Sequence, residues 1–128
     1  MLKLKQIHRD RRGRIYVLSD DKGNEIASLL STNKHFARGG CIHKKNNEYC
    51  VVLNGEILHV KRNQPIERGK KGTMIFIRRN TPHYFVSLTD SLVMEFGATP
   101  EEKKVKHKAT RAIVDKINEE GFFWKTII

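Results

Sequence analysis

Short runs rich in β-branched and aromatic residues recur at regular intervals between residues 14 and 96, and each ends at a turn signal. The signals include SDDKGN (19–24), RRNTP (78–82) and the pair Asn54-Gly55. Evenly spaced runs of this kind predict about eight short strands, the pattern of an all-β sandwich or barrel. The runs are RIYVL (14–18), EIASLL (25–30), FARGGCIH (36–43), EYCVVL (48–53), EILHVKR (56–62), TMIFI (73–77), HYFVSL (83–88) and SLVMEF (91–96).

Three turn signals suggest how neighbouring strands pair. We expect SDDKGN to close a hairpin between the strands on either side of it, and KKNN (44–47) to close a second hairpin. Asn54-Gly55 favours a type I′ turn that leads into the strand at 56–62.

The chain changes character after this β region. Residues 99–121 predict one C-terminal helix over about residues 100–120, with Thr99 as N-cap, Pro100 at the first helical position and Gly121 as the stop. Apolar residues at i, i+4 steps give this helix one apolar stripe, formed by Val105, Ala109, Ile113 and Ile117. The final FFWKTII (122–128) is too apolar for water, so we expect it to pack on the barrel or on a second subunit, and we expect a homodimer.

Length and charge limit the domain count and the partners. At 128 residues the chain suits a single domain, 1–128, with a barrel core over about 14–97. The excess of 25 Lys+Arg over 14 Asp+Glu gives a net charge of +11, which favours anionic partners, whether nucleic acid, phosphate esters or an acidic protein. Among these we expect an anionic small molecule. Nucleic acid is disfavoured, because no aromatic residues interleave with the basic clusters as a stacking surface.

The sequence also bears on location. No apolar stretch is long enough to cross a bilayer, and the first residues lack the apolar region of a signal peptide. We therefore expect a cytoplasmic protein without membrane contact, in which the two cysteines are thiols and not a disulfide framework.

Several side chains that bind metals gather in residues 41–50. Side chains alternate along a strand, so Cys41 and His43 share a face. If KKNN closes a simple hairpin, Glu48 and Cys50 lie on that face as well, and barrel closure would bring His83 across. Sulfur, imidazole and carboxylate together suit a divalent ion such as zinc, or alternatively iron, cobalt, nickel or manganese. The alternatives to a metal site are purely structural roles: a polar cross-strand pair of His43 and Glu48, and cysteines that serve as small buried hydrophobic residues.

The same stretch resembles the first motif of the cupin superfamily, H-x-H, three or four residues, E, six residues, G. This chain has Cys41-x-His43, four residues, Glu48, six residues and Gly55. The resemblance implies a small cupin β-barrel, or jelly roll.

The second cupin motif is matched more loosely. The stretch GTMIFIRRNTPHYFVS begins at Gly72 and contains Pro82-His83, with Ser87 where the motif has asparagine. The two motifs and the strands between them cover about residues 36–96.

Within the superfamily the chain most resembles the dTDP-4-dehydrorhamnose 3,5-epimerases, the dTDP-sugar 3,4-ketoisomerases and the cupin domain of capsular-polysaccharide reductases. In those families an Arg-Gly pair precedes the histidine strand, as Arg38-Gly39 does here, and the arginine is associated with the phosphate-bearing substrate. Cys41 stands where the epimerases and ketoisomerases have a catalytic histidine. A thiol is a poorer proton acceptor there but an excellent metal ligand, so the departure favours metal binding over metal-free proton abstraction.

These observations predict a metal-binding cupin that acts on, or recognises, a phosphorylated carbohydrate such as a sugar nucleotide. Any enzymatic activity would be of the isomerase or epimerase type, and whether Cys50 takes part stays open. The alternatives are a non-catalytic cupin that senses a small ligand or metal and, third, a basic nucleic-acid-binding module. The expected metal ligands are Cys41, His43, Glu48 and His83; the expected catalytic residues are Glu48, His83 and Glu95; and Arg38 is expected to bind substrate.

Overall fold

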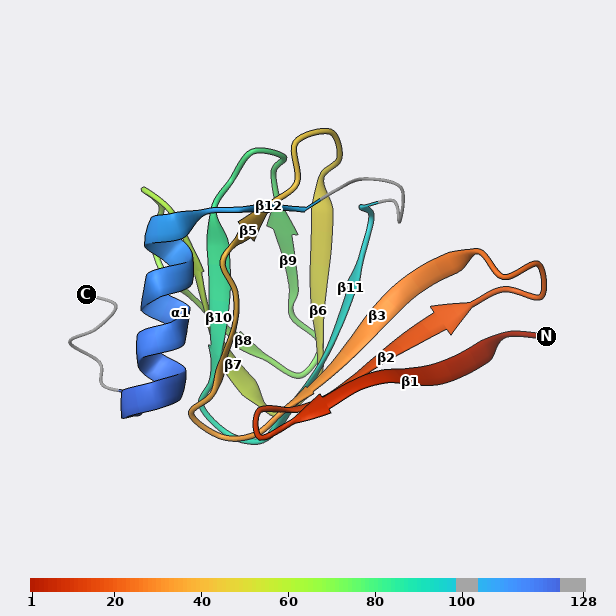
Figure 1. The fold of residues 1–128 in the computed structure, drawn as a ribbon, viewed down its shortest axis with the longest axis horizontal. Coiled ribbons are helices and arrows are strands. Elements are labelled where there is room, and N and C mark those ends of the chain that lie inside the picture. Colours follow the sequence, from red (N-terminus) through yellow and green to blue (C-terminus); the bar gives the residue numbers. More distant parts are fainter. Residues whose placement is uncertain (99–103, 123–128) are drawn as a thin grey trace.

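The computed structural model describes residues 1–98 and 104–122. These residues form antiparallel sheets that enclose a common interior, and a single helix lies against the outside of the barrel (Figure 1). The predicted fold class, a small all-β barrel with one C-terminal helix, is confirmed. No helix in the described part of the chain is long and apolar enough to span a membrane.

The larger sheet has six strands in the order β1-β2-β3-β11-β6-β9. Its hairpin between β2 and β3 was predicted correctly, with Ile15 opposite Leu30. The strand β1 was not predicted, because its apolar residues alternate with the basic side chains of what reads as a charged N-terminus. The strands are β1 (Lys3–Asp10), β2 (Gly13–Ser19), β3 (Glu25–Thr32), β6 (Glu48–Asn54), β9 (Met74–Ile77) and β11 (Ser91–Phe96).

The smaller sheet has four strands in the order β4-β10-β7-β8, and a two-stranded ribbon pairs β12 with β5. Lys106 lies opposite Cys41 in this ribbon. The strands are β4 (Ala37–Gly39), β5 (Cys41–Ile42), β7 (Glu56–Lys61), β8 (Glu67–Lys70), β10 (His83–Ser87) and β12 (Val105–Lys106).

The barrel interior is apolar at one end and polar at the other. Along β6 the inward residues change from Val52 and Cys50, which are fully buried among apolar side chains, to the carboxylate of Glu48. This change places the ionisable groups of the interior at one end of the barrel. The apolar cluster consists of Leu30, Cys50, Val52, Ile57, Ile75, Ile77, Phe85 and Val93.

Helix α1 (Lys108–Glu120) packs on the outer face of the smaller sheet. Val114 and Ile117 are buried against this sheet, and the Asn118 side chain accepts a hydrogen bond from Ala37 N at 2.8 Å and donates one to Ala37 O at 3.0 Å. The polar contact fixes the helix on β4, the strand that also carries Arg38.

The helix begins later than the sequence predicted. His107 is the N-cap, Gly121 ends the helix as expected, and Val105 lies in β12 instead of on the apolar stripe. The helix begins late because residues 105 and 106 pair with strand β5 instead. Such pairing with a distant segment overrides the local helix signal. Thr99, Pro100 and residues 123–128 of the apolar tail lie outside the described residues.

Two of the predicted hairpins are wrong. The strands on either side of KKNN do not pair, because β5 pairs with β12 whereas β6 pairs with β11 and β9. The strands on either side of Asn54-Gly55 also belong to different sheets. Only Gly55 has a positive φ, 79°, whereas a type I′ turn requires positive φ at both central residues. Gly55 is needed because a Cβ there would lie 2.3 Å from the carbonyl oxygen of Asp90.

Candidate functional site

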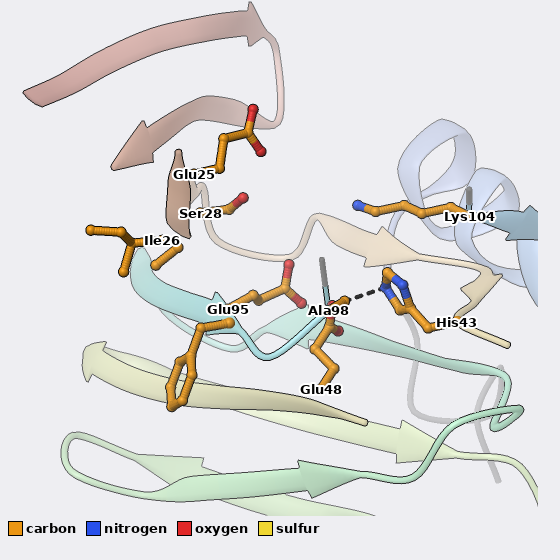
Figure 2. A pocket seen from close by; sticks show the side chains of 10 residues that line it. Glu25, Ile26, Ser28, His43, Glu48, Glu95, Ala98 and Lys104 are labelled. Atoms are coloured by element: carbon orange, nitrogen blue, oxygen red, sulfur yellow. Dashed lines mark ion pairs between the residues drawn. The ribbon is translucent and has the colours of Figure 1, made fainter. Parts of the chain in front are cut away.

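The polar end of the barrel opens into a cavity with two adjoining lobes, which share His43, Glu48, Glu95 and Lys104 as lining residues. We call the larger one, of about 290 Å³, the basic lobe; its further lining includes Arg12, Arg38, Arg111, Cys41 and His83. We call the smaller one, of about 180 Å³, the acidic lobe; its further lining includes Glu25, Ser28 and Phe96 (Figure 2).

A hydrogen-bonded trio lies where the two lobes meet. The Nε2 atom of His43 is 2.9 Å from Oε2 of Glu48, and the Nε2 atom of His83 is 3.3 Å from Oε1 of the same carboxylate. All three side chains are buried, and they come from β6, β10 and the loop between β5 and β6. The structure thus brings together three of the four predicted metal ligands.

The backbone around His83 sets its protonation. Nδ1 of His83 is 2.8 Å from the carbonyl oxygen of Thr81. A carbonyl oxygen only accepts, so Nδ1 carries a proton. Nε2 then either carries a second proton and donates to Glu48, or presents its lone pair to a metal ion, as histidine ligands with a hydrogen-bonded second nitrogen do.

The carboxylates of the site differ in their pKa values. Burial opposes ionisation of Glu48, but the hydrogen bonds from His43 and His83 outweigh it and hold the pKa of Glu48 below its usual value. Burial and the nearby Glu48 charge raise the pKa of Glu95, although Lys104 and the two histidines oppose this rise. Two carboxyl groups with separated pKa values are what general acid–base chemistry requires.

Arg38 is a buried cation on β4, with 4% of its surface exposed. Its Nε atom donates to Thr32 Oγ1 at 2.8 Å, and Nη2 donates to Ser31 O at 3.0 Å. Burial, together with the neighbouring Arg12, lowers the pKa of Arg38 to about 10, so the group stays charged at neutral pH. Within the described residues no carboxylate forms an ion pair with Arg38, whereas Arg12 pairs with Asp10 at 2.7 Å.

The two cysteines lie in different places. Cys41 is half-buried and lines the basic lobe, and Cys50 is fully buried in the apolar cluster. They are not cross-strand neighbours, since β5 and β6 do not pair. Burial raises the pKa of the Cys50 thiol far above its usual value, so this residue is a small core hydrophobe with a protonated sulfur.

The residue types at the junction fit a metal ion, because two imidazoles and a carboxylate form a common catalytic ligand set. Their present arrangement is a hydrogen-bonded one. Across residues 1–98 and 104–122, no three His, Cys, Asp or Glu side chains stand close enough together to hold an ion. Metal binding would therefore require Glu48 to exchange its contacts with His43 and His83 for contacts with the ion.

Comparison with known proteins reveals similar solved structures. The capsular polysaccharide assembling protein CapF from Staphylococcus aureus matches with a TM-score of 0.64 and 16% identity over 81% of this chain and 32% of CapF. KdgF from Halomonas sp. matches with a TM-score of 0.63 and 16% identity over 76% of this chain and 90% of KdgF. A variant of oxalate decarboxylase from Bacillus subtilis matches with a TM-score of 0.65 and 13% identity over 80% of this chain and 29% of the enzyme.

This chain has the cupin fold. It spans about one third of the length of CapF and of oxalate decarboxylase, and at such identities the likeness concerns the fold alone. No protein-family model and no curated protein matches the sequence.

One residue of the barrel interior was missed by the sequence analysis. His59 on β7 is 1% exposed and stacks on His83, with ring centroids 5.7 Å apart and ring planes at 17°. Neither of its ring nitrogens has a hydrogen-bond partner in the part of the chain that the structure describes. Strand alternation was the available signal, because the core residue Ile57 lies two positions earlier on the same strand.

We expect His59 to make the stability of the protein sensitive to acid. Burial, followed by the charges of His83 and Lys61, lowers the pKa of His59 to about 3, below its ordinary value of 6.5. The unfolded chain therefore binds more protons than the folded one between these two pH values, and stability falls as the pH falls through that window. The loss in the free energy of unfolding that is due to His59 is at most about 1.4 kcal/mol per pH unit.

The measurement is urea unfolding at pH 7, 6, 5 and 4 for the wild type and for His59→Leu. The variant should lose less stability on acidification, and the difference isolates His59 because other titrating groups are common to both proteins. Parallel stability curves for the two proteins would contradict this prediction.

Proposed function

We propose that this cupin binds a divalent metal ion and acts on, or recognises, a phosphorylated carbohydrate such as a sugar nucleotide. The observation that carries the proposal is Arg38, a buried guanidinium that lines the basic lobe without an ion-pair partner among the described residues. A buried charge is costly unless an opposite charge compensates it. An anionic ligand in the basic lobe would supply that charge.

The donors of Arg38 suit a phosphate group. Its two hydrogen bonds, to Thr32 and Ser31, use two of the five N–H donors of a guanidinium, and they hold the group in place. Arginine binds phosphate through paired, planar hydrogen bonds. Arg111 and Lys104 line the same lobe and add positive charge at its wall.

The size of the cavity limits how much of the ligand it encloses. The basic lobe, of about 290 Å³, is slightly smaller than the roughly 300–1,000 Å³ found for sites of drug-sized ligands. It therefore suits one sugar ring with its phosphate, and the rest of a nucleotide would extend into solvent.

The metal ion would be held by His43, Glu48 and His83, and Cys41 on the wall of the same lobe is the fourth candidate ligand. A zinc-type ion at such a site acts as a Lewis acid on a carbonyl or hydroxyl oxygen. Hydrogen bonding of His83 to Thr81 O keeps its Nε2 directed at Glu48 and supports this assignment.

Proton transfer is the chemistry that this chain's own residues support. Glu95 lines both lobes, and its raised pKa places it closer to neutral pH than an ordinary carboxyl group. It could take a proton from a sugar carbon next to a carbonyl group, or return one, with His83 or Glu48 as the second proton carrier. The proposed reaction class is an isomerisation or epimerisation.

A binding protein without turnover is the second candidate. Cys41 favours it, because a half-buried thiol stands where the resembling epimerases have a catalytic histidine. The two candidates differ in whether the sugar exchanges a carbon-bound proton with solvent. Nuclear magnetic resonance in D₂O would detect deuterium in the sugar for an enzyme, and none for a binding protein.

The proposal is tested by titrating UDP-glucose, glucose 1-phosphate and glucose into the protein in a calorimeter. We expect binding of the two phosphorylated ligands only, and a 10- to 100-fold loss of affinity in Arg38→Met, as for loss of a charged hydrogen bond. Arg14→Met is the matched control, since Arg14 is exposed on β2 and lines neither lobe. Equal affinities for Arg38→Met and wild type would contradict the proposal.

A further inference from the structure

The two lobes of the cavity carry opposite charge. The basic lobe is lined by Arg12, Arg38, Arg111 and Lys104 against two carboxylates, Glu48 and Glu95. The acidic lobe is lined by three carboxylates, Glu25, Glu48 and Glu95, against Lys104 and His43. Because the lobes adjoin, one small ligand can occupy both of them.

Two of the carboxylates in the acidic lobe lack partners. Glu48 is engaged by two histidines, but Glu25 and Glu95 form no hydrogen bond or ion pair with side chains in the described part of the chain. Lys104 reaches toward the lobe from the side opposite Glu25 (Figure 2), yet it stays beyond the 4.0 Å of an ion pair with either carboxylate. Glu25 is exposed, whereas Glu95 is half-buried, so the unpaired carboxylate of Glu95 is the notable one in a chain with 25 Lys+Arg and 14 Asp+Glu.

The remaining lining of the acidic lobe also suits a cation. Ser28 on β3 lies directly opposite Glu95 on β11, so the two side chains share one face of the sheet. The Ser28 hydroxyl adds a hydrogen-bond acceptor in the same lobe.

We infer that the ligand is zwitterionic, an amino-sugar phosphate whose phosphate lies in the basic lobe and whose ammonium group lies in the acidic lobe beside Glu25 and Glu95. This inference rests on the proposed function and narrows its substrate class. The sugar ring then lies at the junction, against His43 and Glu48, where the two lobes share their lining.

The test compares ligands that differ only at the amino group. Glucosamine, glucose and N-acetylglucosamine, each as the 1-phosphate and as the 6-phosphate, are titrated into the full-length protein in a calorimeter at pH 7. For at least one position of the phosphate, we expect the glucosamine form to bind about tenfold more tightly than the glucose form. The N-acetyl form, which lacks the charge, should show no such gain.

Glu25→Gln should reduce this preference to less than about threefold. Glu56→Gln is the control, because Glu56 pairs with Arg68 away from the cavity and should keep the full preference. Equal binding of amine and hydroxyl forms at both positions overturns the inference while the proposed function stands. A preference that survives in Glu25→Gln overturns it as well, and absence of binding by all six phosphates overturns both.

Discussion

Replacing Glu48 by glutamine is expected to abolish metal binding and to destabilise the protein even without metal. The carboxylate is 6% exposed and receives contacts from His43 at 2.9 Å and His83 at 3.3 Å. A neutral amide of the same size removes the negative charge of Glu48, which is the proposed ligand on β6. It also weakens the two charge-assisted hydrogen bonds from His43 and His83. We expect a loss of about 1.5–3 kcal/mol in the free energy of unfolding.

The pH dependence of the same variant gives a second measurement. Because the folded-state pKa of Glu48 lies below its ordinary value of 4.5, its contribution to stability is present above that pH. The contribution is lost as the pH falls through the folded-state pKa. Wild type should therefore lose more stability than Glu48→Gln on acidification below pH 4.5.

Metal content is measured by elemental analysis of protein that was purified without an affinity tag after metal-supplemented expression. We expect close to one divalent ion per chain in wild type and in the surface control Glu56→Gln, and none in Glu48→Gln. Added metal should raise the melting temperature of wild type and of Glu56→Gln but not that of Glu48→Gln, because binding to the native state adds stability. A full complement of metal in Glu48→Gln, or a metal-free wild type, would refute the metal assignment.

Replacing Gly55 by alanine is expected to be among the most destabilising methyl additions in the chain. Gly55 has φ 79°, and a Cβ atom would lie 2.3 Å from Asp90 O and 2.9 Å from Ser91 Cα. Both obstacles are backbone atoms, one in the β10–β11 connection and one in the first residue of β11, so a side-chain rotation cannot relieve the clash. We expect a loss of about 3 kcal/mol or more in the free energy of unfolding.

The variant Gly72→Ala separates the two causes of this loss, which are the steric clash of the Cβ atom and the backbone strain of a positive φ. Gly72 has a similar φ, 92°, but a Cβ atom there would meet nothing within 4 Å. Its replacement should cost only the backbone strain, about 1–2 kcal/mol. Urea unfolding of both variants measures the difference, and equal losses would show that the clash at Gly55 is relieved by local movement.

The sequence predicted the positions of the strands better than their pairing. Strand positions follow from alternation within one segment, and all eight predicted runs contain strands. Pairing depends on distant segments, and here local turn signals misled. Asn54-Gly55 has the composition of a hairpin turn, yet Gly55 is required by contact with Asp90 from a later part of the chain.

The site was also predicted only in part, because some of its residues come from distant segments of the chain. The cupin-like spacing indicated Cys41, His43, Glu48 and His83, and the structure brings the last three together. Cys41 lines the same cavity, as do Arg38, expected from the Arg-Gly pair, and Glu95, expected from its place in the last strand. Lys104 and Arg111 were missed because they come from the C-terminal segment, whose charges read as a solvated helix face. The pairing of β12 with β5 carries them to the cavity, and no local pattern encodes that pairing.

The pairing of β12 with β5, which brings the C-terminal segment to the cavity, has a consequence for the nascent chain during protein synthesis. The cavity takes Arg12 from the turn between β1 and β2 and Arg111 from the helix α1, so its wall joins segments that are synthesised far apart in time. A ribosome hides the most recent residues in its exit tunnel while it elongates the chain at about 5–20 residues per second. A nascent chain that has exposed only β1 to β11 therefore lacks Lys104 and Arg111 of the cavity wall, and we expect it to bind no ligand until α1 emerges.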